Sequence, residues 1–572
     1  MSFLTIRRND IFFGVYYAYY FILCTINKPL SIMSFEDQIR SIFVEESQIP
    51  DEFRIEEIHQ REYLCNGEMK KWDGAVSEVY SPVCIPGPDG LKRKLIGTYP
   101  VCTEKEANEA LEAAIQAYDN GRGEWPTMGI GDRIKCLENF IFKMIEQRSL
   151  VVKLIMWEIG KAYADSAKEF DRTIEYINAT IDALKDIDRT SSRFEIAEGV
   201  IAQSRRSPLG VVLCMGPFNY PLNETFTTLI PALIMGNTLL FKPPKYGTLL
   251  HYPLLKAFQE SFPKGVVNTV YGRGANVTPG LMATGNINVL AFIGSSKVAN
   301  DLKKRHPKIN RLRAVLSLDA KNLAIITKNA DLKLAVNECI LGALSFNGQR
   351  CTAIKIIYVH KTVADEFLKL LSAGVADLQF GLPWDKNVKL TPLPEANKAD
   401  FLKETIADAE AHGAKVINEN GGTSVETFVY PAILYPVNDK MKLFREEQFG
   451  PIIPVVPFED IEEPIAYQID SPHGQQVSIF SEDADEIASL IDPFVNLVSR
   501  VNINSQCQRG PDVFPFTGRK DSAEGTLSVH DALRAFSIRS LVATKLNESN
   551  KHLINEIVSE HTSNFLSTKF IL

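Results

Sequence analysis

The sequence has few of the features that mark disulfide-linked, zinc-binding or nucleic-acid-binding proteins. It contains nine cysteines in 572 residues, an odd number without a Cys-x-x-Cys pair, so we expect neither a disulfide framework nor a zinc ribbon. Its nine histidines form no His-x-x-x-His pair, and we predict no metal site. Acidic residues outnumber basic ones by 70 to 62, and this net charge of −8 disfavours binding to nucleic acid. The sparse cysteines fit a reducing, cytoplasmic compartment.

The apolar run near the N-terminus is short for a membrane span. Residues 11–26 follow a pair of arginines and number 16, whereas a membrane helix requires about 20 apolar residues. The residues after the run provide no small-residue cleavage site of a secretory signal. Because Met33 offers a second, ordinary start, residues 1–32 are either a translated upstream extension or a targeting or anchor segment. A membrane is an expected partner only in the second case.

The body of the chain is long enough for several domains and alternates between strand-like and helix-like segments. Thr103 and Glu106 form a capping box, and apolar residues behind them recur at helical spacing through residues 106–118, which predicts a helix there. From residue 208 onward, nearly continuous apolar strands alternate with helices, and a second such stretch runs from about residue 321 to 522. This alternation is typical of parallel sheets covered on both faces.

We therefore predict an α/β fold with a doubly wound, Rossmann-like cofactor domain, a second α/β domain and a small oligomerisation hairpin. The hairpin is expected because the strand-like segments near residues 193–208 and 537–544 have no core of their own, which favours a homodimer or homotetramer. The predicted division is an extension and lead-in at 1–61, a cofactor domain at 62–190 and 208–318, oligomerisation strands at 191–207 and 525–545, a catalytic domain at 319–524, and a tail at 546–572.

Cys351 is the sharpest local signal for chemistry. It follows Gly348, Gln349 and Arg350 at the end of a helical segment. An isolated cysteine is more often a small buried hydrophobe, yet an adjacent arginine stabilises the thiolate that a nucleophile requires. Taken alone, the motif leaves both interpretations open.

Six sequence motifs, of which one contains Cys351, occur along the chain in a fixed order. The segments FNYPLNE, FKPP, FIGSSK, FNGQRCT, EEQFGP and QRGPDVFPFTGRKDS together resemble the aldehyde dehydrogenase superfamily. FNYP, GQRC and QRGPDVFPF look more specifically like its non-phosphorylating, NADP-dependent glyceraldehyde-3-phosphate dehydrogenases. The resemblance extends over roughly residues 62–545 and implies an NAD(P)-dependent oxidoreductase acting on an aldehyde.

The resemblance assigns the catalytic steps to two residues. Cys351 would be the nucleophile that adds to the aldehyde carbon, because hydride leaves a tetrahedral thiohemiacetal more readily than a free aldehyde. The side-chain amide of Asn219, with the backbone N–H of Cys351, would donate to the developing oxyanion. Hydride transfer would then leave a thioester for water to cleave.

The resemblance also implies a cofactor site and a substrate site. NADP is the expected cofactor and NAD the alternative, because Lys245 replaces the acidic residue that NAD-preferring relatives usually carry three positions after the ribose lysine. A substrate phosphate would be bound by arginines, whose planar fork makes two charge-assisted hydrogen bonds at once, although surface ion pairs are the ordinary alternative for each. The implied cofactor residues are Lys242, Lys245, Gly294, Ser295, Glu447 and Phe449, and the implied substrate residues are Arg172, Tyr220, Arg350 and Arg509.

The sequence departs from the family at the general base. Relatives carry a glutamate in an L-E-L-G-G-K motif 34 residues before the cysteine, and Ser317 stands there in this chain, within the segment LSLDAK. Asp319 lies two residues on, where an extended segment would place it on the same face, and it is the candidate replacement base. The alternatives are that it is structural, that another acceptor such as coenzyme A takes the acyl group, or that turnover is slow.

Three functions remain in competition at the level of sequence. The leading one is NADP-dependent oxidation of glyceraldehyde 3-phosphate to 3-phosphoglycerate. The second is oxidation of another aldehyde, including formation of an acyl-coenzyme A. The third belongs to a different class, a catalytically impaired protein kept for cofactor binding, and it is motivated by Ser317.

Overall fold

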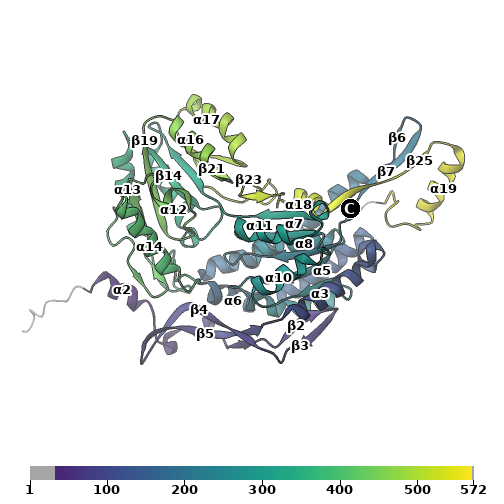
Figure 1. Ribbon diagram of the computed structural model, residues 1–572, viewed down its shortest axis with the longest axis horizontal. Coiled ribbons are helices and arrows are strands. Elements are labelled where there is room, and N and C mark those ends of the chain that lie inside the picture. Colours follow the sequence, from purple (N-terminus) through teal and green to yellow (C-terminus); the bar gives the residue numbers. More distant parts are fainter. Residues whose placement is uncertain (1–32, 570–572) are drawn as a thin grey trace, which may run out of the picture.

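The computed structural model describes residues 33–569, and they form two α/β units with a projecting arm (Figure 1). The apolar segment 11–26 lies outside the described residues. Between residues 33 and 569, no helix is both long enough and apolar enough to cross a membrane. The chain enters through helix α2 (Phe35–Ser41) and a layer of extended strands that runs beneath the first unit. These strands are β1 (Ile58–His59), β2 (Glu62–Cys65), β3 (Glu68–Lys71), β4 (Val76–Gly87) and β5 (Gly90–Pro100).

The first unit is built on a six-stranded sheet in the order β10-β9-β8-β11-β12-β24. The first five strands in that order run parallel, and β24 joins β12 in the antiparallel direction. Every residue of β8 and β9 is buried, which is why these strands read as continuous apolar runs. The strands are β8 (Val211–Met215), β9 (Thr238–Lys242), β10 (Val267–Thr269), β11 (Val289–Ile293), β12 (Arg313–Ser317) and β24 (Ala523–Glu524).

Helices cover this sheet and form a thick layer beyond it. Helix α8 packs on β8, β9 and β11, α3 packs on β8, β9 and β10, and α7 and α18 lie over α8. Helix α3 begins after Thr103, whose side chain accepts the N–H of Lys105, and the capping box with Glu106 is present as predicted. The helices of this unit are α3 (Glu104–Tyr118), α4 (Glu124–Thr127), α5 (Ile130–Glu146), α6 (Arg148–Ile159), α7 (Tyr163–Ser191), α8 (Asn223–Ile234), α9 (Leu255–Ser261), α10 (Gly274–Ala283), α11 (Ser296–Arg305) and α18 (Val529–Ala535).

The second unit has a seven-stranded sheet in the order β15-β18-β19-β14-β13-β21-β22. All neighbouring strands are parallel except β15 and β18. The strands are β13 (Asn322–Ile326), β14 (Ile354–His360), β15 (Lys415–Val416), β18 (Ala432–Tyr435), β19 (Ile452–Phe458), β21 (Gln476–Phe480) and β22 (Arg500–Ile503). The helices are α12 (Leu332–Leu344), α13 (Ala364–Ala376), α14 (Lys398–Ala411), α15 (Lys442–Arg445), α16 (Glu462–Asp470) and α17 (Ala484–Leu497). The predicted α/β fold with two parallel-sheet units is confirmed.

Two short strand pairs complete the second unit. β16 (Ser424–Val425) pairs with β17 (Phe428–Val429), and β20 (His473–Gly474) pairs with β23 (Arg519–Lys520). The predicted boundary between residues 318 and 319 lies in the connection from β12 to β13. The chain returns to the first unit afterwards, because β24 closes the edge of its sheet beside β12.

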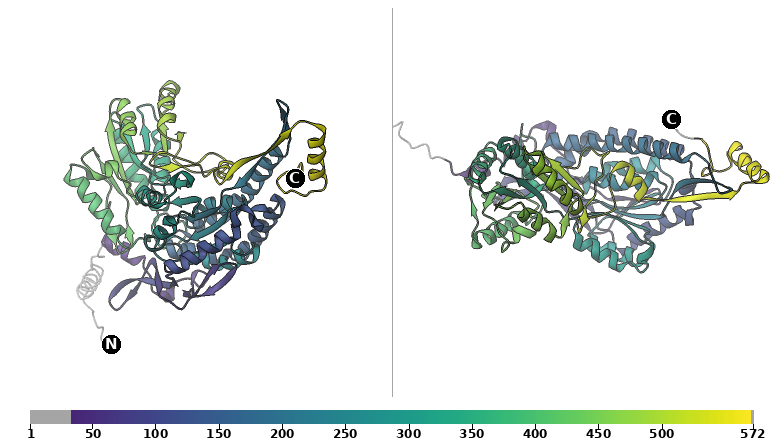
Figure 2. Two further views of the ribbon diagram at one scale, coloured as in Figure 1. Left: turned by 45° about the vertical axis from the view of Figure 1, so that its right-hand side comes forward. Right: turned by 90° about the horizontal axis from the view of Figure 1, so that it is seen from above.

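The arm is a three-stranded antiparallel sheet that extends away from the body (Figures 1 and 2). β7 (Val200–Pro208) lies between β6 (Glu195–Ala197) and β25 (Ser537–Lys545). Helix α19 (Glu548–Ser559) follows β25, and the chain then turns back along the arm, where the side chain of Gln203 bonds both the N–H and the carbonyl of Ser567. The predicted tail therefore contains a helix and contacts β7.

Candidate active site

Cys351 lies in a tight turn between α12 and β14. The turn contains three consecutive residues with positive φ, namely Phe346, Asn347 and Gly348. A Cβ at Gly348 would lie 2.6 Å from the carbonyl oxygen of Ala343, so glycine is required where the backbone packs this closely. The side chain of Asn322, at the start of β13, donates to the carbonyl of Cys351 at 2.7 Å. This hydrogen bond ties the turn that carries Cys351 to the seven-stranded sheet.

The thiol is poorly ionised in this environment. The side chain of Cys351 is half-buried, and burial raises its pKa to about 12, with the nearby carboxylates of Glu224 and Glu447 acting in the same direction. The positive charges of Arg509 and Lys355 oppose this rise in pKa. The backbone N–H of Cys351 donates to no acceptor among the residues that the structure describes. It is therefore available to an oxyanion.

Asn219 is presented to the cleft by a buried ion pair. Lys161 and Glu169 form this pair beneath the loop after β8, and Lys161 donates to the carbonyl of Asn219 at 2.8 Å. Glu169 accepts the backbone N–H groups of Leu222 and Asn223, at the start of α8. One hydrogen of the Asn219 amide is donated to the carbonyl of Gln349 at 2.8 Å, which leaves the second for a substrate oxygen. The sequence analysis missed this ion pair, because nothing in its local pattern distinguishes Lys161 and Glu169.

One cavity of about 1080 Å³ brings the catalytic and cofactor candidates together. It lies where the loops after the carboxyl ends of β8, β9, β11 and β12 meet those of the second unit, which is the place where open α/β sheets bind ligands. The candidates that line it are Asn219, Lys242, Lys245, Gly294, Ser295, Asp319, Cys351, Glu447 and Phe449. Ser317 and Glu224 line the same cavity.

The cofactor candidates provide two positive charges and a loop whose backbone a phosphate group can approach closely. Lys242 is buried at the end of β9, and burial lowers its pKa to about 8. Neither Lys242 nor Lys245 pairs with a carboxylate anywhere in the described part of the chain, so both charges are available to an anion. Ser295 caps α11, and a Cβ at Gly294 would lie 2.4 Å from the ring of Phe292. These features fit a phosphate-bearing dinucleotide laid against the helix N-terminus.

Asp319 is engaged at that same helix end. Its Oδ2 atom accepts the backbone N–H of Ser296 at 2.8 Å and the hydroxyl of Ser296 at 2.7 Å. Ser317 is buried at the position where relatives carry the base, and its carbonyl accepts the N–H of Gly294 at 3.1 Å. The recorded contacts of Asp319 therefore lie with α11, and its role as a base stays a prediction.

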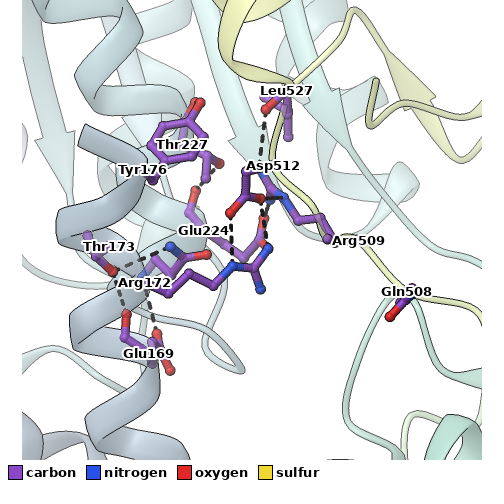
Figure 3. A network of polar contacts seen from close by, with 12 residues as sticks. Glu169, Arg172, Thr173, Tyr176, Glu224, Thr227, Gln508, Arg509, Asp512 and Leu527 are labelled. Atoms are coloured by element: carbon purple, nitrogen blue, oxygen red, sulfur yellow. Dashed lines mark hydrogen bonds and ion pairs between the residues drawn. The ribbon is translucent and has the colours of Figure 1, made fainter. Parts of the chain in front are cut away.

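The substrate candidates are divided between two places. Arg172, on α7, makes a bidentate pair with Asp512 at 2.9 and 2.7 Å, and Arg509 bridges Asp512 and Glu224 (Figure 3). Two guanidinium groups thus face two carboxylates, and Asp512 and Glu224 are partners that the sequence analysis did not identify. Their positions in the QRGPD and NYPLNE motifs were the available signal.

The other two substrate candidates are held elsewhere. Tyr220 stacks over the ammonium group of Lys161, with 3.6 Å between Nζ and the ring centroid. Arg350 donates to the carbonyls of Leu341 and Gly342 at the end of α12, at 3.1 and 2.9 Å. The structure does not bring Arg350 into contact with Arg172 or Arg509, and none of the four substrate candidates lines the cavity.

The comparison with known proteins decides the family. The aldehyde dehydrogenase family profile matches residues 83–542, which is most of the chain. The chain belongs to the aldehyde dehydrogenase family. The resemblance inferred from the six motifs is therefore confirmed. So is the expected enzyme class, an aldehyde oxidoreductase.

Relatives of this aldehyde dehydrogenase carry more than one substrate name. The chain is 31% identical over 459 residues to an NADP-dependent glyceraldehyde-3-phosphate dehydrogenase of Streptococcus equinus, covering 77% of this chain and 91% of the relative. It is 28% identical over 434 residues to a 3-sulfolactaldehyde dehydrogenase of Priestia aryabhattai, covering 74% and 87%. The crystal structure of NADP-dependent glyceraldehyde-3-phosphate dehydrogenase from Bacillus halodurans, complexed with NADP, superposes with a TM-score of 0.78 at 30% identity, covering 86% of this chain and 100% of that one.

Proposed function

We propose that this aldehyde dehydrogenase oxidises glyceraldehyde 3-phosphate to 3-phosphoglycerate with NADP, through a thioester on Cys351. The observation that carries the proposal is that Cys351, Asn219, Lys242 and Lys245 all line one cavity, and neither lysine pairs with a carboxylate between residues 33 and 569. The names of the relatives at about 30% identity support both the substrate and the cofactor.

The chain supplies the nucleophile and the oxyanion site. The Cys351 sulfur loses its proton to solvent and bonds to the aldehyde carbon, whose oxygen becomes negative. The free hydrogen of the Asn219 amide and the N–H of Cys351 donate to that oxygen, and removing one such donor typically costs about 10²–10³ in rate. When bound, the nicotinamide ring supplies the acceptor for the hydride that leaves this carbon. Water then cleaves the thioester and regenerates the thiol.

Lys242 and Lys245 support the preference for NADP. A lysine three residues after the ribose lysine attracts a 2′-phosphate, whereas an acidic residue there would repel it. Lys245 lies on the surface at the mouth of the cavity, with its Nζ 4.7 Å from the ring centroid of Tyr246. Its charge is accessible to a phosphate at that place, and NAD lacks the group that would use it.

A second candidate substrate is an aldehyde other than glyceraldehyde 3-phosphate. The observation that favours it is the pairing of Arg172 and Arg509 with Asp512 and Glu224, which leaves no excess positive charge in that network. A doubly charged phosphate would have to displace a carboxylate there. The relative named 3-sulfolactaldehyde dehydrogenase shows that matching chains carry other substrate names.

The test is a substrate screen that follows NADPH absorbance. Purified protein is mixed with glyceraldehyde 3-phosphate or another aldehyde, with NADP or NAD, and with or without coenzyme A. Fastest turnover with glyceraldehyde 3-phosphate and NADP, independent of coenzyme A, is the expected result. NADP binding without any reduction would support the cofactor-binding protein that Ser317 motivates, and a requirement for coenzyme A would support an acyl-transfer reaction.

Cys351→Ala tests the nucleophile directly. We expect the variant to lose oxidation entirely while NADP still binds, because no other atom in the cavity is assigned the bond to carbon. Mass spectrometry after mixing with aldehyde and NADP should find the acyl group on Cys351 in the native chain and nowhere in the variant. Unchanged oxidation by Cys351→Ala would remove the proposed mechanism.

A further inference from the structure

The position of the family's general base holds a hydroxyl in this chain. Ser317 is buried in the cavity wall and cannot act as a carboxylate base at neutral pH. Asp319, two residues later, accepts both the N–H and the hydroxyl of Ser296 through one oxygen. Hydrolysis of a thioester still requires removal of a proton from water, to which a positioned base contributes about 10²–10⁴ in rate. One oxygen of Asp319 is thus committed to α11, and the other carboxylates of the cavity wall are further candidates for the base.

Two carboxylates, those of Glu224 and Glu447, share the cavity wall with Cys351. The charges of Glu224 and Glu447 both raise the pKa of the thiol, and Glu224 has the larger effect of the two. Glu447 lies beside Lys355, with 3.3 Å between Oε1 and Nζ, and two residues before Phe449 in the segment assigned to the cofactor. Glu224 lies in the first turn of α8, five residues after Asn219.

The surroundings of Glu224 hold its carboxylate in place and leave one oxygen open. Its Oε2 atom pairs with Arg509, which is itself fixed by Asp512 at 3.1 Å (Figure 3). Only 9% of the Glu224 side chain is exposed, yet the residue lines the cavity. No hydrogen bond reaches its Oε1 atom from any residue between 33 and 569. This oxygen therefore has an open position for a hydrogen bond from a water molecule in the cavity.

We propose that Glu224 is the general base that hydrolyses the Cys351 thioester, in place of the glutamate that Ser317 replaces. In the step, the oxygen of water bonds to the acyl carbon and one proton of water passes to Glu224. The C–S bond then breaks, and its electron pair stays on sulfur. The proton on Glu224 passes to sulfur and restores the thiol, and the released acid loses its remaining proton to solvent. The inference rests on the proposed function.

The experiment compares single-turnover and steady-state kinetics of Glu224→Gln with glyceraldehyde 3-phosphate and NADP. Glutamine keeps an acceptor oxygen for Arg509 but cannot hold the proton. We expect a burst of one NADPH per site at a rate close to that of the native chain, followed by steady turnover that is about 10²–10⁴ slower. Intact-mass measurement should find the acyl group retained on Cys351. Native steady turnover without retained acyl group would overturn the proposal, as would loss of the burst from a folded variant.

Two further variants separate a catalytic role from a structural one. Ser317→Glu, added to Glu224→Gln, returns a carboxylate to the family's position, and we expect it to restore at least part of the steady rate. Glu175→Gln changes an exposed carboxylate on α7 and should leave both phases unchanged. If Asp319→Asn gives the stalled acyl-enzyme and Glu224→Gln does not, Asp319 is the base and the proposal is wrong.

The rate of Cys351 alkylation tests the role of Glu224 in a measurement that does not depend on catalytic turnover. Because the charge of Glu224 raises the pKa of Cys351, Glu224→Gln should make alkylation of this thiol by iodoacetamide faster at fixed pH, and an unchanged rate would contradict the proximity that the proposal needs. If Glu224→Gln does not fold, Glu224→Asp keeps the charge opposite Arg509 and is expected to show the same burst with slowed turnover. An absent burst in the native chain would overturn the proposed function itself, whereas a normal native burst with normal Glu224→Gln turnover would overturn only the role of Glu224.

Discussion

At the scale of single residues, the thiol of Cys351 must lose a proton that its surroundings retain. Burial raises the pKa to about 12, so the thiolate fraction at neutral pH is small and grows about tenfold for each pH unit below that value. The charges of Arg509 and Lys355 only partly offset the burial. We therefore expect the thiol of Cys351 to be mostly protonated, and so weakly nucleophilic, when the cavity holds neither cofactor nor substrate.

The pH dependence of alkylation tests this expectation. With cofactor and substrate absent, we expect the rate of Cys351 modification by iodoacetamide to rise continuously between about pH 7 and pH 11, because the thiolate fraction has no plateau below the raised pKa. Peptide mapping by mass spectrometry reports the rate at this site. A plateau above about pH 9.5, as an ordinary thiol with a pKa of about 8.5 gives, would show that the pKa of Cys351 is not raised.

The sequence predicted which residues belong to the active site better than it predicted which side chains they contact. Cys351 and Asn219 follow from the ordered motifs, and the structure places both at one cavity. The pairing of Arg509 with Glu224 could not be predicted, because 285 residues separate the two and no local pattern records the contact. Arg350 shows the same limit, since its guanidinium turns back to the end of α12.

At the scale of secondary-structure elements, the N-terminus of α11 is already occupied by a negative charge. Asp319 accepts the first N–H of the helix, at the place where we propose that the cofactor's pyrophosphate approaches Ser295. A helix N-terminus attracts anions, and two anions competing for it repel each other. Asp319 is therefore expected to weaken cofactor binding.

Asp319→Asn measures this competition. Removing the negative charge from the helix end that we assign to the pyrophosphate should tighten NADP binding by about tenfold, as titration by intrinsic fluorescence or calorimetry would show. Glu524→Gln is the matched control, because Glu524 pairs with Lys303 on the same helix but lies away from its N-terminus. Weaker binding by Asp319→Asn would mean that the carboxylate helps the cofactor, for instance by holding Ser296 in place.

Most of the longer helices and strands could be predicted from the sequence, and β24 is an example of a strand that could not. The capping box at Thr103 marks the start of α3, and the continuous apolar runs mark β8, β9 and β11. β24 could not be anticipated, because this two-residue strand exists only through its pairing with β12, some 200 positions earlier in the chain. Strands of this length carry no periodicity from which a sequence pattern could be read.

At the scale of the whole molecule, the arm leaves apolar side chains uncovered. Ile196 is 63% exposed and Leu541 is 66% exposed on a sheet that stands away from the body (Figure 2). Exposed apolar strands of this kind are usually covered by another chain. We propose that the arm is the contact between copies in a homodimer or homotetramer.

Leu541→Asp tests the role of the arm. A charge on its apolar surface should shift the oligomer toward the monomer, which light scattering coupled to size-exclusion chromatography would detect as a lower mass. Phe142→Asp on α5 is the matched control, because Phe142 is also 66% exposed but lies off the arm. Equal masses for the native chain and Leu541→Asp would place the contact elsewhere.

The contacts among Arg172, Asp512, Arg509 and Glu224 join distant parts of the chain, which affects when this part of the site forms during folding. Asp512 is 340 residues from Arg172, so this part of the site exists only after the last third of the chain has docked onto α7 and α8. Contacts of such sequence separation form late, since the loop between them must first be closed. Four of the residues assigned to the dinucleotide lie between positions 242 and 295, so we expect this part of the cofactor site to form before the network of arginines and carboxylates.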